Sequence, residues 1–192
     1  MSAPSVLVTG GLDGVGKEIC DYFAPNSMGI SRRNGFDIGR PEDHRRIVEL
    51  SLQHDIFVNH AHNGHFSGQT DLLYEVFEAW EKNEKSGFIV STGSFATYMP
   101  QGGFKRYSVL KRALEIANQQ CCKKIETGLV PFRMTLIKPG MLDTPASREK
   151  PHWSGNGVRG RDLAELIRFL YTGPKDLLMN EVTLSAILPQ PS

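Results

Sequence analysis

The 192-residue chain has few cysteines and no long apolar run. Its three cysteines, Cys20, Cys121 and Cys122, lack the spacing of a disulfide framework or a zinc cluster. No stretch approaches the roughly 20 apolar residues that cross a bilayer, and the first residues lack the basic and apolar regions of a signal peptide. We therefore expect a cytoplasmic protein that has no membrane partner.

The chain also lacks an excess of charge of either sign. Its 22 Lys and Arg residues and 21 Asp and Glu residues leave a formal net charge of +1. No strong field is therefore expected to attract nucleic acid or an acidic membrane. Apolar residues make up 40% of the chain, as in ordinary soluble domains. This length predicts a single domain over residues 1–192 with a sizeable core.

Short apolar runs alternate with longer stretches of helical periodicity. The alternation predicts a Rossmann-like α/β fold: a doubly wound parallel sheet of six or seven strands with helices on both faces. Too few residues separate Ser31 from Asp37 for a parallel crossover, so residues 36–38 should form a third strand reduced to an edge stub, or an extended loop. Strands are expected at 5–9, 28–31, 55–59, 88–91, 132–137 and 182–184, and helices at 15–23, from 41, and at 71–83, 107–126 and 162–171.

A glycine-rich turn joins the first expected strand to the first helix, with glycines at 10, 14 and 16 in the order G-x-x-x-G-x-G. Residues without Cβ let the backbone come close to a pyrophosphate, and the helix N-terminus offers free N–H groups and a positive dipole end. A tight turn without a ligand is the alternative. The candidate contact residues are Gly10, Gly11, Leu12, Asp13, Gly14, Val15 and Gly16.

The end of the second expected strand indicates which dinucleotide binds. An NAD site usually carries an acidic residue there for the ribose hydroxyls, whereas this chain has Ser31, Arg32 and Arg33. Arginine can hold a 2′-phosphate through two parallel bonds. These residues favour NADP(H) over NAD(H), and the alternative is a pair of solvated surface arginines.

Tyr107 and Lys111 lie one turn apart at the start of the long helix. A phenol has a reference pKa of about 10, so proton exchange near neutrality needs a shift of roughly three units, or about 4 kcal/mol. One ammonium about 4 Å away supplies about that much at an effective dielectric near 20. Ser94, which follows the strand at 88–91, can hold a substrate oxygen beside the phenol. Taken alone, the tyrosine and lysine are also typical of an exposed surface pair.

Together, these motifs resemble the short-chain dehydrogenase/reductase family over residues 5–184. The resemblance implies NADP(H)-dependent interconversion of a carbonyl and an alcohol. In that scheme Tyr107 gives or takes the proton, Lys111 holds the nicotinamide ribose and lowers the tyrosine pKa, and Ser94 positions the oxygen. Further motif matches imply cofactor contacts from Asp37, Ile38, Asn59, His60, Ala61, Tyr107, Lys111, Pro139, Gly140 and Thr144.

Departures from the family pattern leave other functions open. His62 replaces a glycine near the cofactor, and residues 67–69 contain no counterpart of the family's further catalytic asparagine. A non-catalytic NADP(H)-binding sensor or scaffold is one alternative, and an epimerase or dehydratase is another. His60, His62 and His65 have no cysteine or carboxylate at ligand spacing, so no metal is expected.

The substrate segment is expected at 141–161, and the substrate is expected to be a small carbonyl or alcohol. In this segment Met141 and Trp153 offer apolar surface, and Arg148, Lys150 and His152 offer groups that could meet an anion.

The helices at 107–126 and 162–171 resemble those that form family dimers, so we expect a homo-oligomer, a dimer or a tetramer. The apolar face of the second helix either serves that interface or covers the sheet. That face consists of Leu163, Leu166, Ile167 and Leu170.

Overall fold

The computed structural model describes residues 3–65, 68–98, 106–151 and 153–187. Its strands form one six-stranded sheet, parallel throughout, in the order β2-β1-β3-β4-β5-β6. This confirms the predicted Rossmann-like fold. The strands are β1 (Val6–Thr9), β2 (Ser27–Ile30), β3 (Ile56–Asn59), β4 (Gly87–Thr92), β5 (Phe132–Pro139) and β6 (Glu181–Leu184). The α-helices are α1 (Gly14–Phe23), α2 (Pro41–Ser51), α3 (Gln69–Lys82), α4 (Arg106–Ile125), α5 (Pro145–Arg148) and α6 (Gly160–Thr172), and the short 3₁₀ helices are η1 (Arg32–Asn34) and η2 (Phe95–Thr97).

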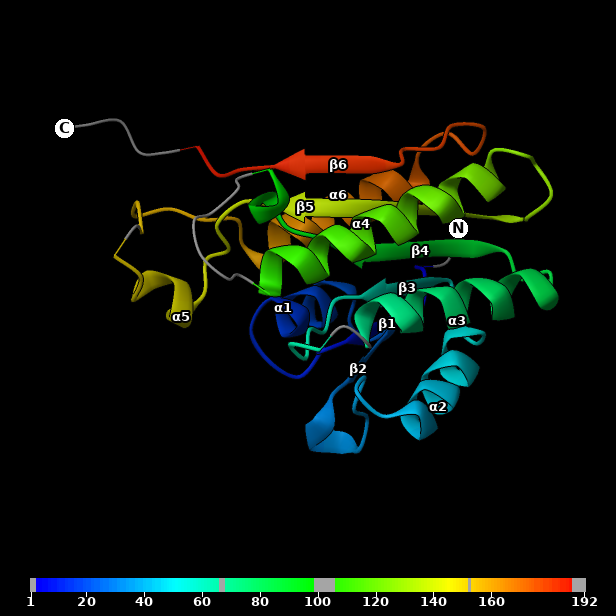
Figure 1. Ribbon diagram of the computed structural model, residues 1–192, viewed down its shortest axis with the longest axis horizontal. Coiled ribbons are helices and arrows are strands. Elements are labelled where there is room, and N and C mark those ends of the chain that lie inside the picture. Colours follow the sequence, from blue (N-terminus) through cyan, green and yellow to red (C-terminus); the bar gives the residue numbers. More distant parts are fainter. Residues whose placement is uncertain (1–2, 66–67, 99–105, 152, 188–192) are drawn as a thin grey trace.

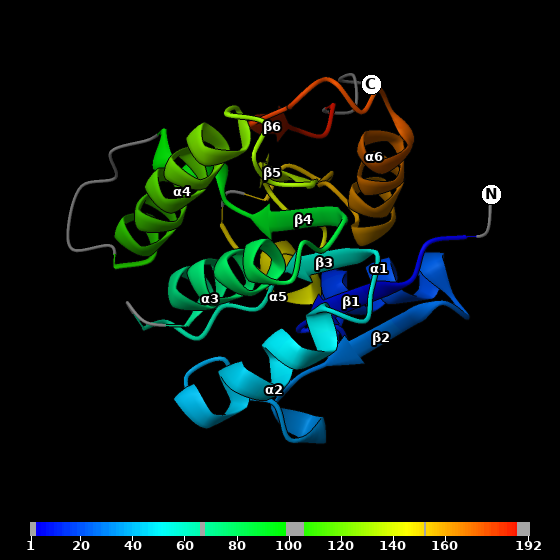
Figure 2. The same cartoon turned by 90° about the vertical axis from the view of Figure 1, so that its right-hand side faces the viewer.

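Helices cover both faces of the sheet (Figures 1 and 2). Helices α2, α3 and α4 pack on one face, where Leu7 of β1 joins a core with Ile47 and Leu114. On the other face, Val8 of the same strand joins Ile19 of α1 and residues of α6. Successive side chains of a strand point to opposite faces, so a run that is apolar throughout, such as β1, is buried on both sides.

The strand order places a crevice at the carboxyl end of β1. After β1 the chain adds β2 on one side, and it then returns to add β3 on the other side. The connections that leave β1 and β3 therefore separate at their carboxyl ends, where doubly wound sheets bind ligands. The strand arrows in Figure 1 point toward this end of the sheet, and α5 lies beyond it.

Two close backbone approaches explain glycines in and beside the turn after β1. A Cβ on Gly16 would lie 2.2 Å from the carbonyl oxygen of Gly10, so the first turn of α1 packs directly on the strand exit. A Cβ on Gly11 would lie 2.5 Å from the Cα of Gly29 in β2. Gly14 differs, because it has φ +48° and a Cβ there would meet no atom within 4 Å.

The structure decides two points that the sequence left open, the conformation of residues 36–38 and the role of the apolar face of α6. Residues 36–38 form a loop rather than a strand stub, because η1 and a turn use up the short connection after β2. The leucine-rich face of α6 covers the sheet, since Leu163, Ile167 and Leu170 are buried in the core. No helix among the described residues has both the length and the apolar character needed to cross a membrane.

We predict that Gly16→Ala destabilises the fold more than Gly14→Ala. The Gly16 methyl would overlap rigid backbone, which should lower the free energy of unfolding by about 3 kcal/mol. A methyl group on Gly14 would contact no other atom, so the substitution should cost only the strain of a positive φ, about 1 kcal/mol. Urea unfolding of both variants checks the order, and equal losses would show that the contact between Gly16 and Gly10 does not limit the turn.

Candidate active site

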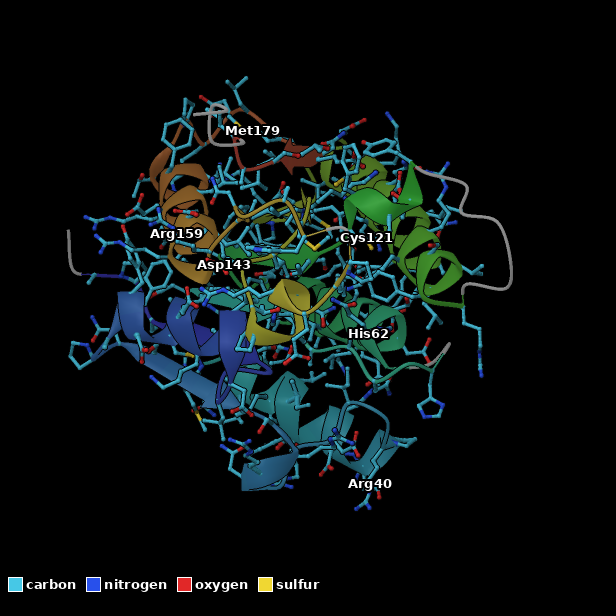
Figure 3. The ribbon with its side chains drawn as sticks, turned by 90° about the vertical axis from the view of Figure 1, so that its left-hand side faces the viewer. Arg40, His62, Cys121, Asp143, Arg159 and Met179 are labelled. Carbon is cyan, nitrogen blue, oxygen red and sulfur yellow. The ribbon has the colours of Figure 1, made fainter. Side chains whose placement is uncertain are left out.

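A cavity of about 390 Å³ lies at the carboxyl ends of β1, β3, β4 and β5. Its volume falls within the range of about 300–1,000 Å³ that is usual for small-molecule sites. Figure 3 views the molecule from this end of the sheet and labels His62, one of the residues of the wall. The lining includes Thr9, Gly10, Ser31, Arg32, Asp37, Ile38, His60, Ala61, His62, Thr92, Ser94, Tyr107, Lys111, Pro139, Gly140 and Leu142.

The cavity brings together most of the side chains expected at the site. All three expected catalytic residues, Ser94, Tyr107 and Lys111, line it, although they come from different parts of the chain. Other expected residues lie outside the lining: Gly11, Leu12, Asp13, Gly14, Val15, Gly16, Arg33, Asn59 and Thr144. Of these, Asn59 is fully buried at the end of β3, and Thr144 caps α5 by accepting a hydrogen bond from the backbone N–H of Ser147.

Thr9 fixes the turn that follows β3. Its hydroxyl oxygen accepts hydrogen bonds from the backbone N–H groups of His60 and Ala61, both at 2.9 Å. The His60 ring then lies with Nδ1 3.1 Å from the hydroxyl of Thr92. Burial and the nearby charge of Lys111 lower the pKa of His60 to about 4. His60 is therefore neutral at pH 7 and forms part of the wall rather than a proton donor for substrate.

Lys111 is buried, and the two groups that accept hydrogen bonds from its ammonium within the described part of the chain are neutral. Its Nζ donates to the side-chain oxygen of Gln69 at 2.8 Å and to the carbonyl oxygen of Thr92 at 2.7 Å. Its side chain carries no ion pair among the described residues. Burial disfavours the charged form and lowers the pKa of Lys111 to about 7. The lysine therefore changes its charge within the physiological range.

Tyr107 stands at the mouth of the cavity and is 43% exposed. The Nζ of Lys111 lies 5.8 Å from the centroid of its ring. The His62 ring packs edge-on against the phenol ring with their centroids 5.1 Å apart. Burial and the charge of Lys111 lower the pKa of His62. The histidine that departs from the family pattern thus packs against the candidate proton donor.

Ser94 begins the short helix η2, and its hydroxyl accepts a hydrogen bond from the backbone N–H of Ala96 at 3.2 Å. The preceding residue, Gly93, donates its backbone N–H to the carbonyl oxygen of Ile137 in β5 at 2.8 Å. The neighbouring Lys138 is buried, and its Nζ pairs with carboxylates of Glu115 and Glu181, each at 3.2 Å. The backbone bond from Gly93 therefore ties the start of the Ser94 segment to β5.

The two arginines after β2 have different surroundings. Arg32 lines the cavity, whereas the guanidinium of Arg33 donates to the Asp13 carboxylate at 2.6 Å in an exposed ion pair. Exposed pairs of this kind contribute about 0–1 kcal/mol. Asp37 also lines the cavity, and its carboxylate accepts the backbone N–H of Gly39. This part of the cavity therefore has one arginine in the wall, and a second arginine next in sequence that pairs with Asp13.

In the substrate segment, Leu142 reaches the cavity wall, and a short bridge joins it to Val158. Arg148, one of the groups expected to meet an anion, instead donates to the Asp143 carboxylate at 2.6 Å. His152 lies outside the described residues.

Sequence reasoning missed Gln69, the first residue of α3. This residue lies in the 67–69 stretch, which contains no asparagine, and its carboxamide contacts Lys111 directly. The signal was available in the side chain itself, because glutamine carries the same amide as asparagine on a chain that is one methylene longer.

Comparison with known proteins agrees with this architecture, although no family model matches the chain. An uncharacterized oxidoreductase of Staphylococcus saprophyticus is 25% identical over 205 residues, which cover 95% of this chain and 86% of that protein. An uncharacterized oxidoreductase of Staphylococcus epidermidis is 26% identical over 188 residues, covering 95% and 74%. The crystal structure of a 3-ketoacyl-(acyl-carrier-protein) reductase from Brucella melitensis, complexed with NADH, matches with a TM-score of 0.71 at 18% identity, over 94% of this chain and 95% of that chain.

The fold and the strand-end cavity define a doubly wound α/β protein of the Rossmann type. The oxidoreductase names of its sequence relatives and the fold of its structural neighbour agree with the resemblance to the short-chain dehydrogenase/reductase family that the motifs indicate.

We predict that Lys111 makes stability depend on pH above neutrality. Between pH about 7 and 10.5 the unfolded chain binds the lysine proton more fully than the folded chain does. Stability should therefore rise with pH in this window, by at most about 1.4 kcal/mol per pH unit. Urea unfolding from pH 7 to 9 should show the wild type gaining stability relative to Lys111→Met, and parallel curves would contradict the low pKa.

Proposed function

We propose that this protein is an NADP(H)-dependent oxidoreductase that interconverts a small carbonyl compound and its alcohol. The observation that carries the proposal is that one cavity collects Tyr107, Lys111 and Ser94 at the crevice of a doubly wound sheet. The oxidoreductase names of the sequence relatives and the NADH bound to the structural neighbour support the same reaction class.

The walls of the cavity suit a dinucleotide. Gly10 lines the cavity and has φ +73°, a backbone conformation that glycine adopts readily and that other residues rarely adopt. The adjacent N-terminus of α1 carries a positive dipole end that suits phosphate. Asp37 and Ile38, for which the family resemblance implies adenine contacts, line the same cavity. When bound, the nicotinamide would supply or accept a hydride at the substrate carbon.

In the proposed reaction, the protein handles the proton and the oxygen. The Tyr107 hydroxyl donates its proton to the substrate oxygen during reduction and takes it back during oxidation. A positive charge on Lys111 stabilises the negative charge that develops on the phenol oxygen. The Ser94 hydroxyl donates a hydrogen bond to the same substrate oxygen and holds it beside the phenol.

We predict that Tyr107→Phe abolishes carbonyl reduction and leaves NADPH binding within about two-fold of the wild type. The phenyl ring keeps the edge contact with His62 but has no proton to give. NADPH fluorescence titration and a panel of carbonyl substrates measure the two properties separately. Turnover that survives would reject Tyr107 as the proton donor. A wild type that binds NADPH and reduces no substrate would favour the non-catalytic sensor.

We propose NADP(H) rather than NAD(H) because Ser31 and Arg32, which follow the second strand where an NAD site usually has an acidic residue, line the cavity. We predict that Arg32→Ala weakens NADPH binding by roughly 10- to 100-fold, the cost of losing a charge-assisted hydrogen bond, and leaves NADH binding little changed. Arg33→Ala is the matched variant, and its loss should be smaller because its guanidinium is paired with Asp13. Equal affinity of the wild type for both cofactors would reject the preference.

We also propose that the protein is cytoplasmic and forms a homo-oligomer, a dimer or a tetramer, without the leucine-rich face of α6, which is buried in the core. Val109 and Ile116 stand seven residues apart on α4 and are 54% and 47% exposed. They supply an apolar surface on the helix that the family resemblance assigns to dimers. Sedimentation equilibrium measures the mass, and a value equal to one 21.4 kDa chain would reject the dimer.

A further inference from the structure

The carboxamide of Gln69 connects two strand ends to the buried lysine. Its Nε2 donates to the carbonyl oxygen of Asn59 at 2.7 Å and to that of Thr92 at 3.2 Å. Its Oε1 accepts a hydrogen bond from Lys111 Nζ at 2.8 Å. The Thr92 carbonyl also accepts from Lys111. The side chain is 5% exposed, so water competes little for these bonds.

We propose that Gln69 is a positioning residue that aims the Lys111 ammonium at Tyr107 and keeps its charge unneutralised. The inference rests on the proposed role of Lys111 in proton exchange. Gln69 is not among the residues that line the cavity, and it therefore acts through the lysine rather than on substrate.

An amide side chain suits the demands of this position. The two carbonyl oxygens require a donor, and the ammonium requires an acceptor, and the carboxamide supplies both at once. An ionised glutamate would set a carboxylate against the carbonyl oxygens of Asn59 and Thr92, while leucine would remove the donor from both carbonyls and the amide acceptor from the ammonium. Asparagine is shorter by one carbon–carbon bond of about 1.5 Å.

The geometry also assigns the N–H donors of the Lys111 ammonium to different partners. An ammonium has three N–H groups, and Gln69 and Thr92 take two of them. The third is left for the side of the cavity where Tyr107 stands. Because both partners are neutral, no carboxylate cancels the field of the ammonium at the phenol. Holding the lysine with dipoles rather than with an anion preserves its effect on proton exchange.

The other titratable groups around Lys111 do not interfere above pH 7. His60 and His62 reach the lysine from the turn after β3, and Tyr107 stands one turn earlier on α4. Burial lowers the pKa of His60 to about 4, and burial together with the charge of Lys111 lowers the pKa of His62. His60 is therefore neutral in the range where Lys111, with its pKa of about 7, loses its proton, and the lowered pKa of His62 favours its neutral form there.

The test changes the partner of the lysine in two opposite ways. Gln69→Glu places an anion on the ammonium and should raise the pKa of Lys111 by one pH unit or more. Gln69→Leu removes an acceptor and should lower it by about one unit. Gln119→Glu makes the same amide-to-carboxylate change at an exposed position on α4 and should leave the pKa of Lys111 unchanged.

Two measurements follow the change in the pKa of Lys111. NMR titration of 15N-lysine protein without cofactor follows the Lys111 signal, which is assigned with Lys111→Met. The alkaline limb of kcat/KM for carbonyl reduction should move in the same direction as the Lys111 pKa, upward for Gln69→Glu and downward for Gln69→Leu.

The outcomes separate this inference from the proposed function. Identical titration of Lys111 in wild type, Gln69→Glu and Gln69→Leu would overturn the positioning role, even if both variants lose stability. If Gln69→Glu does not fold, Gln69→Leu alone decides by the presence or absence of its downward shift. Shifts at Lys111 in a protein that reduces no carbonyl would support the coupling between the two side chains and overturn the proposed reaction.

Discussion

The burial of the Lys111 ammonium, which pairs with no carboxylate in the described part of the chain, is the constraint that organises the cavity. Moving a charged lysine out of water costs several kcal/mol unless other groups replace its hydration. Here the replacements are the Thr92 carbonyl and the Gln69 amide oxygen, at 2.7 and 2.8 Å. Both belong to places where parallel strands end or the next helix begins, and the ammonium therefore depends on the sheet being complete.

The strand ends are arranged so that their unpaired groups serve the site. A strand that stops leaves a carbonyl oxygen that no longer has a ladder partner. At the end of β3 the Asn59 carbonyl oxygen accepts a hydrogen bond from the Gln69 side chain. The Asn59 side-chain amide in turn donates a hydrogen bond of 2.8 Å to the backbone carbonyl oxygen of Gln69. At the end of β1 the hydroxyl of Thr9 satisfies two N–H groups of the neighbouring turn. The same bonds that close the sheet also shape the cavity wall.

The sequence predicted the fold well because its strongest signals are local. Apolar runs of four to eight residues and amphipathic stretches located the strands and helices of the sheet to within a few residues. The conformation of residues 36–38 depends on η1 and on the turn after it. Ser31 and Asn34 form a capping box at the start of η1, in which each side chain accepts a hydrogen bond from a backbone N–H. The role of α6 was likewise left open, because an apolar helix face looks the same whether it covers a sheet or a partner.

The candidate site was predictable where a motif fixes spacing, and not where tertiary contacts choose a partner. Tyr107 and Lys111 share a helix face, so their proximity follows from the spacing alone. The link between Lys111 and Gln69 spans 42 residues and exists only because β3 and β4 end at the same level. Adjacent residues also diverge: Arg32 faces the cavity while Arg33 turns to Asp13, twenty residues away. Spacing identifies which chemistry a chain carries, but the neutral surroundings that give a buried lysine a pKa near 7 are created only when distant strand ends meet.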